Sequence, residues 1–190
     1  MILKPFDVLL YQNYGYMGTL ISWGEWVGRP GEALQYSHVG LVYADITQSF
    51  EMNPPAARVF PMSQVPMNRL DVWRLAIGGV DVFDDADAVA AAKAQADAMV
   101  GKPYDYGFIG KALGASVLAR VGLSGLASRW MQANQPTQHS AVCSNTAEVV
   151  IGAGVRVHHP DWTIEPQGIG PGEMEPSDWP LVNGLYRVAS

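Results

Sequence analysis

Residues 36–43 have the sequence Tyr36-Ser37-His38-Val39-Gly40-Leu41-Val42-Tyr43. The run that follows the histidine is almost entirely apolar, which is typical of a strand covered by a core. His38 begins this predicted strand, so its ring can project from the sheet edge into a cleft. Histidine is the side chain that most often acts as a general base, and His38 is therefore a candidate catalytic residue.

A second stretch contains the only cysteine and reads His139-Ser140-Ala141-Val142-Cys143-Ser144-Asn145-Thr146-Ala147-Glu148-Val149-Val150. The pattern predicts a helix over residues 144–151, with the cysteine at its start. A thiol at that position feels the positive end of the helix dipole and several free backbone N–H groups. The same N–H groups can form an oxyanion hole. Cys143 is therefore the candidate nucleophile.

A carboxylate would complete this pair by orienting the imidazole. If the strand of His38 and the next strand form a hairpin that turns at Ala44-Asp45, Glu51 lies opposite His38. The same register sets Gln48 opposite Leu41. Glu51 is the first candidate for the orienting residue, and Gln48 is the alternative.

The rest of the chain shows a mixed pattern of strands and helices. Strands are expected over residues 7–11, 39–43, 48–52, 71–75 and 184–188. Helices are expected over residues 18–27, 84–100, 108–131 and 144–151, and a loop over residues 158–180. Strands with helices inserted between them predict an α+β fold. The 190 residues fit one domain, with a helical insertion around residues 107–133.

Composition narrows the classes of partner. The net charge of −6 argues against nucleic acid, because proteins that bind nucleic acid concentrate Lys and Arg. A single cysteine excludes an intramolecular disulfide. The apolar tract over residues 108–126 is interrupted by Lys111 and Arg120, so no transmembrane segment is expected. On one helix these two charges would lie on opposite faces, which also argues against a helix lying on a membrane surface.

The first seven residues lack the basic start and the small-residue cleavage site of a signal peptide. We therefore expect a chain that is cytoplasmic as synthesised. An action on the cell wall would require delivery by a phage particle or a dedicated secretion system. Whether the chain is part of such a larger assembly is left open by the sequence.

Taken together, these motifs resemble the circularly permuted NlpC-like family of papain-fold amidases, of the YiiX/YaeF type. The matching stretches run over nearly the whole chain: Asp7-Val8-Leu9-Leu10-Tyr11, Ser37-His38-Val39-Gly40, the Glu51 strand, Pro103-Tyr104-Asp105-Tyr106-Gly107, Cys143-Ser144 and Pro176-Ser177-Asp178. Two positions depart from the family pattern. Phe6 stands where the family tends to have glycine, and Asn145 stands where an acidic residue is common.

The resemblance implies a small antiparallel barrel-like sheet packed against the helix that bears the nucleophile. It implies a triad in which Cys143 attacks, His38 transfers the proton and Glu51 orients the ring, without a metal or another cofactor. The residues expected to line the substrate cleft are Tyr36, Ser37, Tyr104, Tyr106 and Ser144.

The expected reaction is hydrolysis of an amide bond through a thioester, with a cell-wall (peptidoglycan) peptide as the leading substrate. One alternative is an amidase, esterase or acyltransferase acting on N-acyl or ester lipids, with residues 108–131 beside an acyl pocket. Another is a silent binding or structural module of the same fold.

His139 is a rival base. A metal site formed by His139, Cys143, His158 and His159 matches no trusted zinc spacing.

Overall fold

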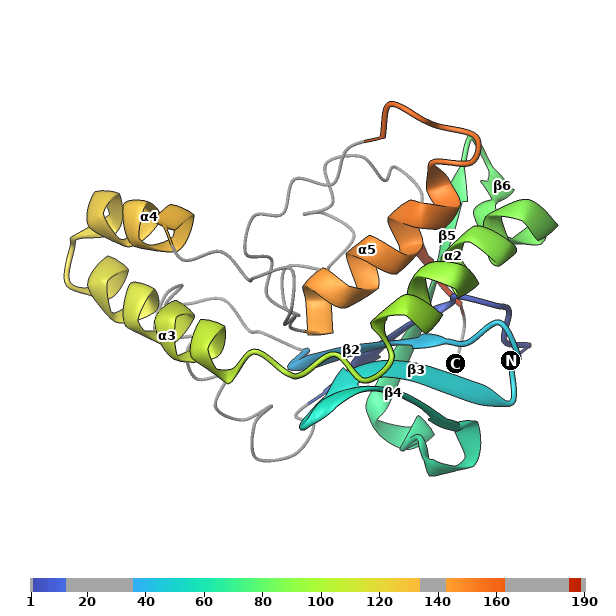
Figure 1. Ribbon diagram of the computed structural model, residues 1–190, viewed down its shortest axis with the longest axis horizontal. Helices are drawn as coiled ribbons and strands as arrows, with labels where there is room; N and C mark the ends of the chain where they lie inside the picture. Colours follow the sequence, from blue (N-terminus) through green and yellow to red (C-terminus); the bar gives the residue numbers. More distant parts are fainter. Residues whose placement is uncertain (1, 13–35, 134–142, 163–184, 189–190) are drawn as a thin grey trace.

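The computed structural model describes residues 2–12, 36–133, 143–162 and 185–188. Strands and helices together make an α+β fold, as the sequence predicts (Figure 1). In chain order the elements are β1 (Val8–Tyr11), β2 (His38–Val42), β3 (Gln48–Asn53), β4 (Ala56–Pro61), η1 (Met62–Gln64), η2 (Met67–Arg69), β5 (Leu70–Ile77), β6 (Val80–Asp81), η3 (Val82–Asp84), α2 (Ala86–Met99), α3 (Tyr106–Arg120), α4 (Ser124–Ala133), α5 (Cys143–Val155) and β7 (Leu185–Arg187).

The paired strands are antiparallel and follow the order β4-β3-β2-β1-β5-β6, and β7 also pairs with β5. The five expected strands correspond to β1, β2, β3, β5 and β7. The sequence did not predict β4, because Pro54 and Pro55 precede it and Pro61 ends it. The helix expected over residues 18–27 lies outside the described residues, as does most of the loop expected over residues 158–180.

The register of the β2–β3 hairpin differs from the expectation. Glu51 pairs with Gly40 and not with His38, so the predicted register was wrong by two residues. Asp45 explains the shift, because its carboxylate accepts hydrogen bonds from the backbone N–H of Thr47 at 3.0 Å and from the Thr47 hydroxyl at 2.7 Å. This turn occupies residues 44–47. A shift of two residues keeps Glu51 on the same face of the sheet as His38.

Helices α2 and α5 lie together over one face of the sheet (Figure 1). Ala88, Ala92 and Ala96 recur every four residues on α2 and are fully buried, so the two helices can pack closely. On α5, Gly154 makes room for the Phe83 ring, since a Cβ at this glycine would lie 2.4 Å from Phe83 Cε1. This packing fixes the direction of α5, the helix that begins at Cys143.

Phe6 has a backbone φ of 59°, in the left-handed region that favours glycine. Its ring is buried and lies 5.1 Å, centroid to centroid, from that of Phe83. The backbone conformation is thus the kind that suits glycine, and burial of the aromatic ring offsets the strain at this residue.

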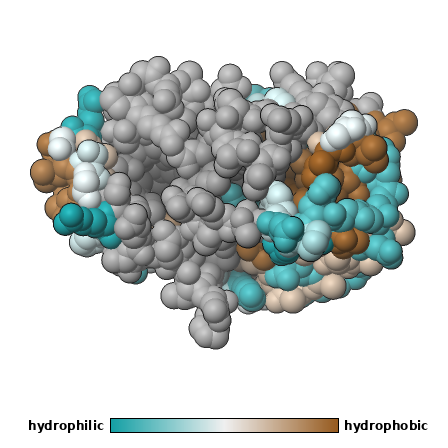
Figure 2. Space-filling model, turned by 90° about the horizontal axis from the view of Figure 1, so that it is seen from above, coloured by the Kyte–Doolittle hydropathy of each residue, from teal (hydrophilic) through white to brown (hydrophobic). Residues whose placement is uncertain are grey.

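Helices α3 and α4 form a hairpin at one end of the molecule, where apolar and polar residues lie side by side on the surface (Figures 1 and 2). The segment expected to be helical over residues 108–131 is helical, but it forms two helices, because the chain turns at Gly122, which has a φ of 83°. Asp105 begins α3 by accepting a hydrogen bond from the N–H of Phe108 at 2.7 Å. Within the part of the chain that the structure describes, no helix has the length and apolar character needed to cross a membrane.

Candidate active site

Cys143 is the first residue of α5, one residue before the start that the sequence predicts. The first N–H groups of a helix have no acceptor within the helix, so this thiol lies beside donors that can stabilise negative charge. Its side chain is buried in the main core, to which Tyr104 also belongs.

His38 is the first residue of β2, and its buried ring lies between two polar side chains. His38 Nε2 is 3.0 Å from Glu51 Oε2. The side chain of Cys143 also lies close enough to the ring to raise the pKa of His38. The strand start and the helix start thus bring together the three residues named from the sequence, in the order thiol, imidazole, carboxylate.

Two opposing effects determine the protonation of His38. Burial lowers the pKa of the imidazole, because the charged ring loses its hydration. The hydrogen bonds to Cys143 and Glu51, and the negative charges of both partners, outweigh this effect and raise the pKa from 6.5 to about 10. The stability that these contacts give the folded state is therefore complete below about pH 6.5 and is lost as the pH rises towards 10.

Glu51 is held by more than His38. The Tyr11 hydroxyl donates to Glu51 Oε1, and the Ser49 hydroxyl lies 3.3 Å from the same oxygen. Because Gly40 is its direct partner across the sheet, a Cβ at this glycine would lie 2.7 Å from the Cγ of Glu51. Because Gly40 has no side chain, the Glu51 side chain can lie over this residue. Its carboxylate can then reach His38, which is two residues earlier on β2.

The residues expected to line the cleft lie in different environments. Tyr36 is buried and donates its hydroxyl hydrogen bond to Asp71 on β5, and Ser37 is buried. Tyr104 is buried too, and burial is the main reason that its pKa is raised, with a further contribution from the charge of Cys143. Tyr106 is half-exposed, and its ring lies 5.2 Å from that of Tyr104. The side chain of Ser144 lies outside the described part of the structure.

The alternative residues are less well placed. Gln48 is three residues before Glu51 on β3, so the two side chains point to opposite faces of the sheet. His139 lies outside the described residues. Among the residues that are described, no group of three or more His, Cys, Asp or Glu side chains could hold a metal ion.

The network also contains residues that the sequence reasoning did not select. Tyr11 is the partner of His38 across the β1–β2 pair, and Ser49 lies two residues before Glu51. Polar residues at alternate positions of a buried strand were a usable signal, because buried polar groups require partners. Thr146 lies one turn after Cys143, and its buried hydroxyl has no hydrogen-bond partner within the described structure.

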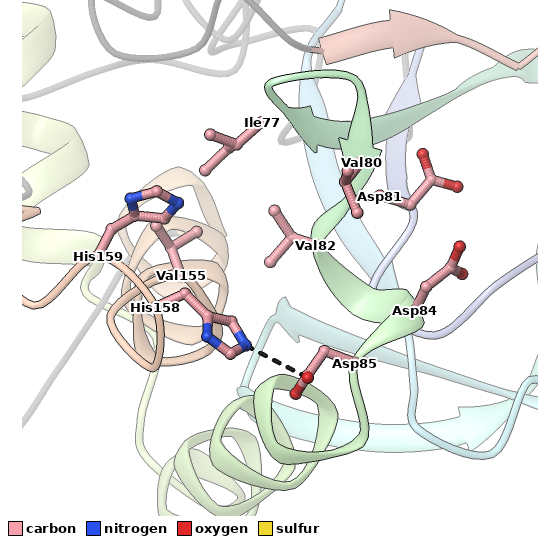
Figure 3. Close-up of a pocket in the computed structure, with 9 residues that line it drawn as sticks. All are labelled: Ile77, Val80, Asp81, Val82, Asp84, Asp85, Val155, His158 and His159. Carbon is pink, nitrogen blue, oxygen red and sulfur yellow. Dashed lines mark ion pairs between the residues drawn. The ribbon is translucent and has the colours of Figure 1, made fainter.

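The far end of α5 contains a cavity of about 400 Å³. Figure 3 shows Val155, His158 and His159 on one side of it, facing Ile77 and Val82. The helix has thirteen residues, so this cavity is separated from Cys143 by about 18 Å of helix. His158 and His159 therefore lie far from the thiol, which removes them from a shared metal site with Cys143.

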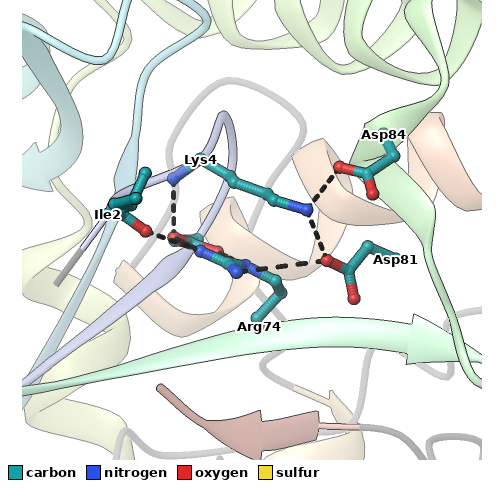
Figure 4. A network of polar contacts seen from close by, with 6 residues as sticks. Ile2, Lys4, Arg74, Asp81 and Asp84 are labelled. Carbon is teal, nitrogen blue, oxygen red and sulfur yellow. Dashed lines mark hydrogen bonds and ion pairs between the residues drawn. The ribbon is translucent and has the colours of Figure 1, made fainter. Parts of the chain in front are cut away.

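Charged residues near this cavity tie the N-terminal segment to the sheet (Figure 4). Arg74 donates to both carboxylate oxygens of the buried Asp7, each at 2.7 Å. Lys4 Nζ lies 2.7 Å from Asp81 and 2.6 Å from Asp84. These ion pairs connect the start of β1 with β5 and η3, so we assign them to the support of the fold.

Comparison with known proteins brings no match to the chain, either from family models or from curated sequences. The interpretation of the site therefore depends on its geometry and chemistry.

Proposed function

We propose that this protein is a cysteine hydrolase of the permuted papain-like type that cleaves amide bonds through a thioester intermediate. The observation that carries the proposal is the buried His38 ring, which lies 3.0 Å from Glu51 and whose pKa is raised by both Cys143 and Glu51. A thiol at a helix start, an imidazole and a carboxylate in this order are the parts of a nucleophilic triad. A chain order with the histidine strand before the cysteine helix supports the permuted arrangement.

Each residue has a distinct part in the proposed reaction. Glu51 accepts from Nε2 of His38, which leaves Nδ1 to act on the thiol and the substrate. The sulfur of Cys143 attacks the carbonyl carbon, and the N–H groups at the start of α5 stabilise the oxyanion. His38 then protonates the leaving amine, which breaks the C–N bond and leaves a thioester. The neutral ring next takes a proton from water, whose oxygen attacks the thioester and releases the acid and the thiolate.

The substrate class that we propose first is a peptide of the cell wall. The second candidate is an N-acyl or ester lipid, and one observation favours it: the α3–α4 hairpin, which begins beside Tyr104, carries exposed apolar side chains. The two candidates differ in their response to acyl chain length. Each methylene buried in an acyl pocket contributes about 0.8 kcal/mol, close to fourfold in kcat/KM.

Alkylation tests the nucleophile before the substrate is known. Because Cys143 is the only cysteine, iodoacetamide should modify the chain once, and the rate at pH 6 should exceed that of a free thiol. The variant His38→Ala should react at least about tenfold more slowly at that pH, because the thiolate loses its imidazolium partner. Intact-mass measurements against time give both rates, and the melting temperature checks that the variant is folded.

A thiol that reacts only after unfolding, or equally fast with and without His38, would contradict the triad. The protein would then be a catalytically silent binding or structural module of the same fold. With an active protein, release of peptides from purified walls supports the first substrate. A steep increase of kcat/KM with acyl length on chromogenic esters, without wall cleavage, would overturn it in favour of lipid.

A further inference from the structure

The end of the α3–α4 hairpin exposes an unusual concentration of apolar side chains. We define the hairpin tip as residues 117–130. Five of the twelve large hydrophobic side chains that are exposed in the described structure lie within it, with exposed fractions from 44% at Trp130 to 65% at Val121. The other three are Val117, Leu123 and Leu126. A concentration of exposed apolar side chains marks an interaction site more often than isolated exposed residues do.

The charged residues of the hairpin itself all have one sign. Residues 106–147 contain none of the eighteen acidic residues, whereas Lys111, Arg120 and Arg129 lie on the two helices and are exposed. Arg120 and Arg129 belong to the tip itself. The chain as a whole has a net charge of −6, so the positive charge of this hairpin is a local feature.

We propose that the hairpin tip binds the surface of an anionic phospholipid bilayer. Apolar side chains enter the headgroup region, basic side chains attract anionic lipids, and tryptophan favours the interface between water and hydrocarbon. A second copy of the chain is a poorer occupant, because two tips brought face to face would oppose like charges. The break at Gly122 gives the tip a surface that a single straight helix lacks.

The position of the hairpin relates this surface to Cys143. Tyr106, at the start of α3, packs against Tyr104, whose phenol feels the charge of Cys143. The fifteen residues of α3 correspond to about 21 Å of helix, so the far end of α3 lies at about that distance from Tyr106. Docking does not depend on the proposed hydrolysis, and its test measures no turnover.

Sedimentation with vesicles tests the proposal on the full chain. The protein should bind vesicles of phosphatidylglycerol and phosphatidylcholine, and bind pure phosphatidylcholine vesicles much more weakly. Arg120→Gln with Arg129→Gln should weaken binding to the anionic vesicles about 25-fold, at about fivefold for each lost charge. The matched control, Lys102→Gln with Arg156→Gln, changes the net charge equally outside the hairpin and should alter binding less than about twofold.

The apolar contribution needs its own pair of variants. Val121→Asp with Leu126→Asp should weaken binding at least about tenfold. Ile46→Asp with Val100→Asp adds the same charge at two similarly exposed positions elsewhere and should leave most of the binding. If the first pair fails to fold, the arginine variants decide the question.

Three results would overturn the proposal. The first is absence of binding to anionic vesicles at low salt, and the second is an equal loss of binding in the tip variants and their controls. The third is a dimer in analytical ultracentrifugation that Val121→Asp with Leu126→Asp dissociates, without vesicle binding, which would make a second copy the occupant.

Discussion

The two ends of α5 each have a histidine paired with a carboxylate, in very different surroundings. At the Cys143 end, His38 and Glu51 approach to 3.0 Å with side chains 7% and 1% exposed. At the other end, His158 and Asp85 approach to 3.3 Å with side chains 55% and 40% exposed. Similar distances therefore conceal different electrostatics, because water and salt screen the exposed pair and barely reach the buried one. Burial, more than proximity, makes the first pair a candidate catalytic group.

Removing the carboxylate from the buried pair should have the largest effect on stability. Glu51→Ala removes the carboxylate that the His38 ring and the Tyr11 hydroxyl contact in the buried site. Breaking a buried pair in this way costs about 3–5 kcal/mol, which a urea titration followed by circular dichroism would measure at pH 7.

The matched change at the other end is His158→Ala, which removes the exposed pair and leaves Asp85 free to cap α2. Its free energy of unfolding should equal that of the wild type within error. Equal losses in both variants would show that burial does not distinguish the two ends.

A smaller effect is expected from closing the space in front of Glu51. Gly40→Ala places a methyl group 2.7 Å from Glu51 Cγ, so the carboxylate must move away from His38. Overpacking of this kind costs about 1–3 kcal/mol, and alkylation of Cys143 should slow with it. The control is Gly114→Ala on α3, where a Cβ meets nothing within 4 Å and helix propensity predicts a gain of up to about 1 kcal/mol. If the alkylation rate of Cys143 is unchanged in Gly40→Ala, the glycine is not needed to position the Glu51 carboxylate.

The smallest effect concerns the unpartnered hydroxyl one turn after Cys143. Thr146→Val removes a buried polar group without a hydrogen bond in the described structure, so stability should stay the same or rise by about 1 kcal/mol. Thr47→Val, which removes a hydroxyl bonded to Asp45, should not stabilise the protein. A loss of stability in Thr146→Val, measured by calorimetry, would mean that this hydroxyl has a partner in solution.

The sequence predicted the elements that carry the site better than it predicted their exact alignment. The apolar run after His38 and the helix pattern after Cys143 are local signals, so β2 and α5 could be located from the residues alone. The register of β2 and β3 could not, because it depends on how the Asp45 side chain organises a four-residue turn. Glu51 remained on the correct face only because the error was an even number of residues.

The supporting residues were harder to predict for a different physical reason. Tyr11 reaches Glu51 across two strand pairings, and Asp71 meets Tyr36 from a strand 35 positions later, so neither contact has a local pattern. The hairpin break between α3 and α4 was missed because Gly122 is one glycine among several in an otherwise helical segment. Its left-handed φ becomes evident only in three dimensions.

The central claim is that His38 is held as a cation between Cys143 and Glu51, and nuclear magnetic resonance titration of the His38 ring nitrogens tests it most directly. The ring should titrate near pH 10 in the wild type. In Cys143→Ala the pKa should fall, because the ring loses a hydrogen bond and a negative charge while remaining buried. A His38 ring that titrates near pH 6.5 in both proteins would contradict the account.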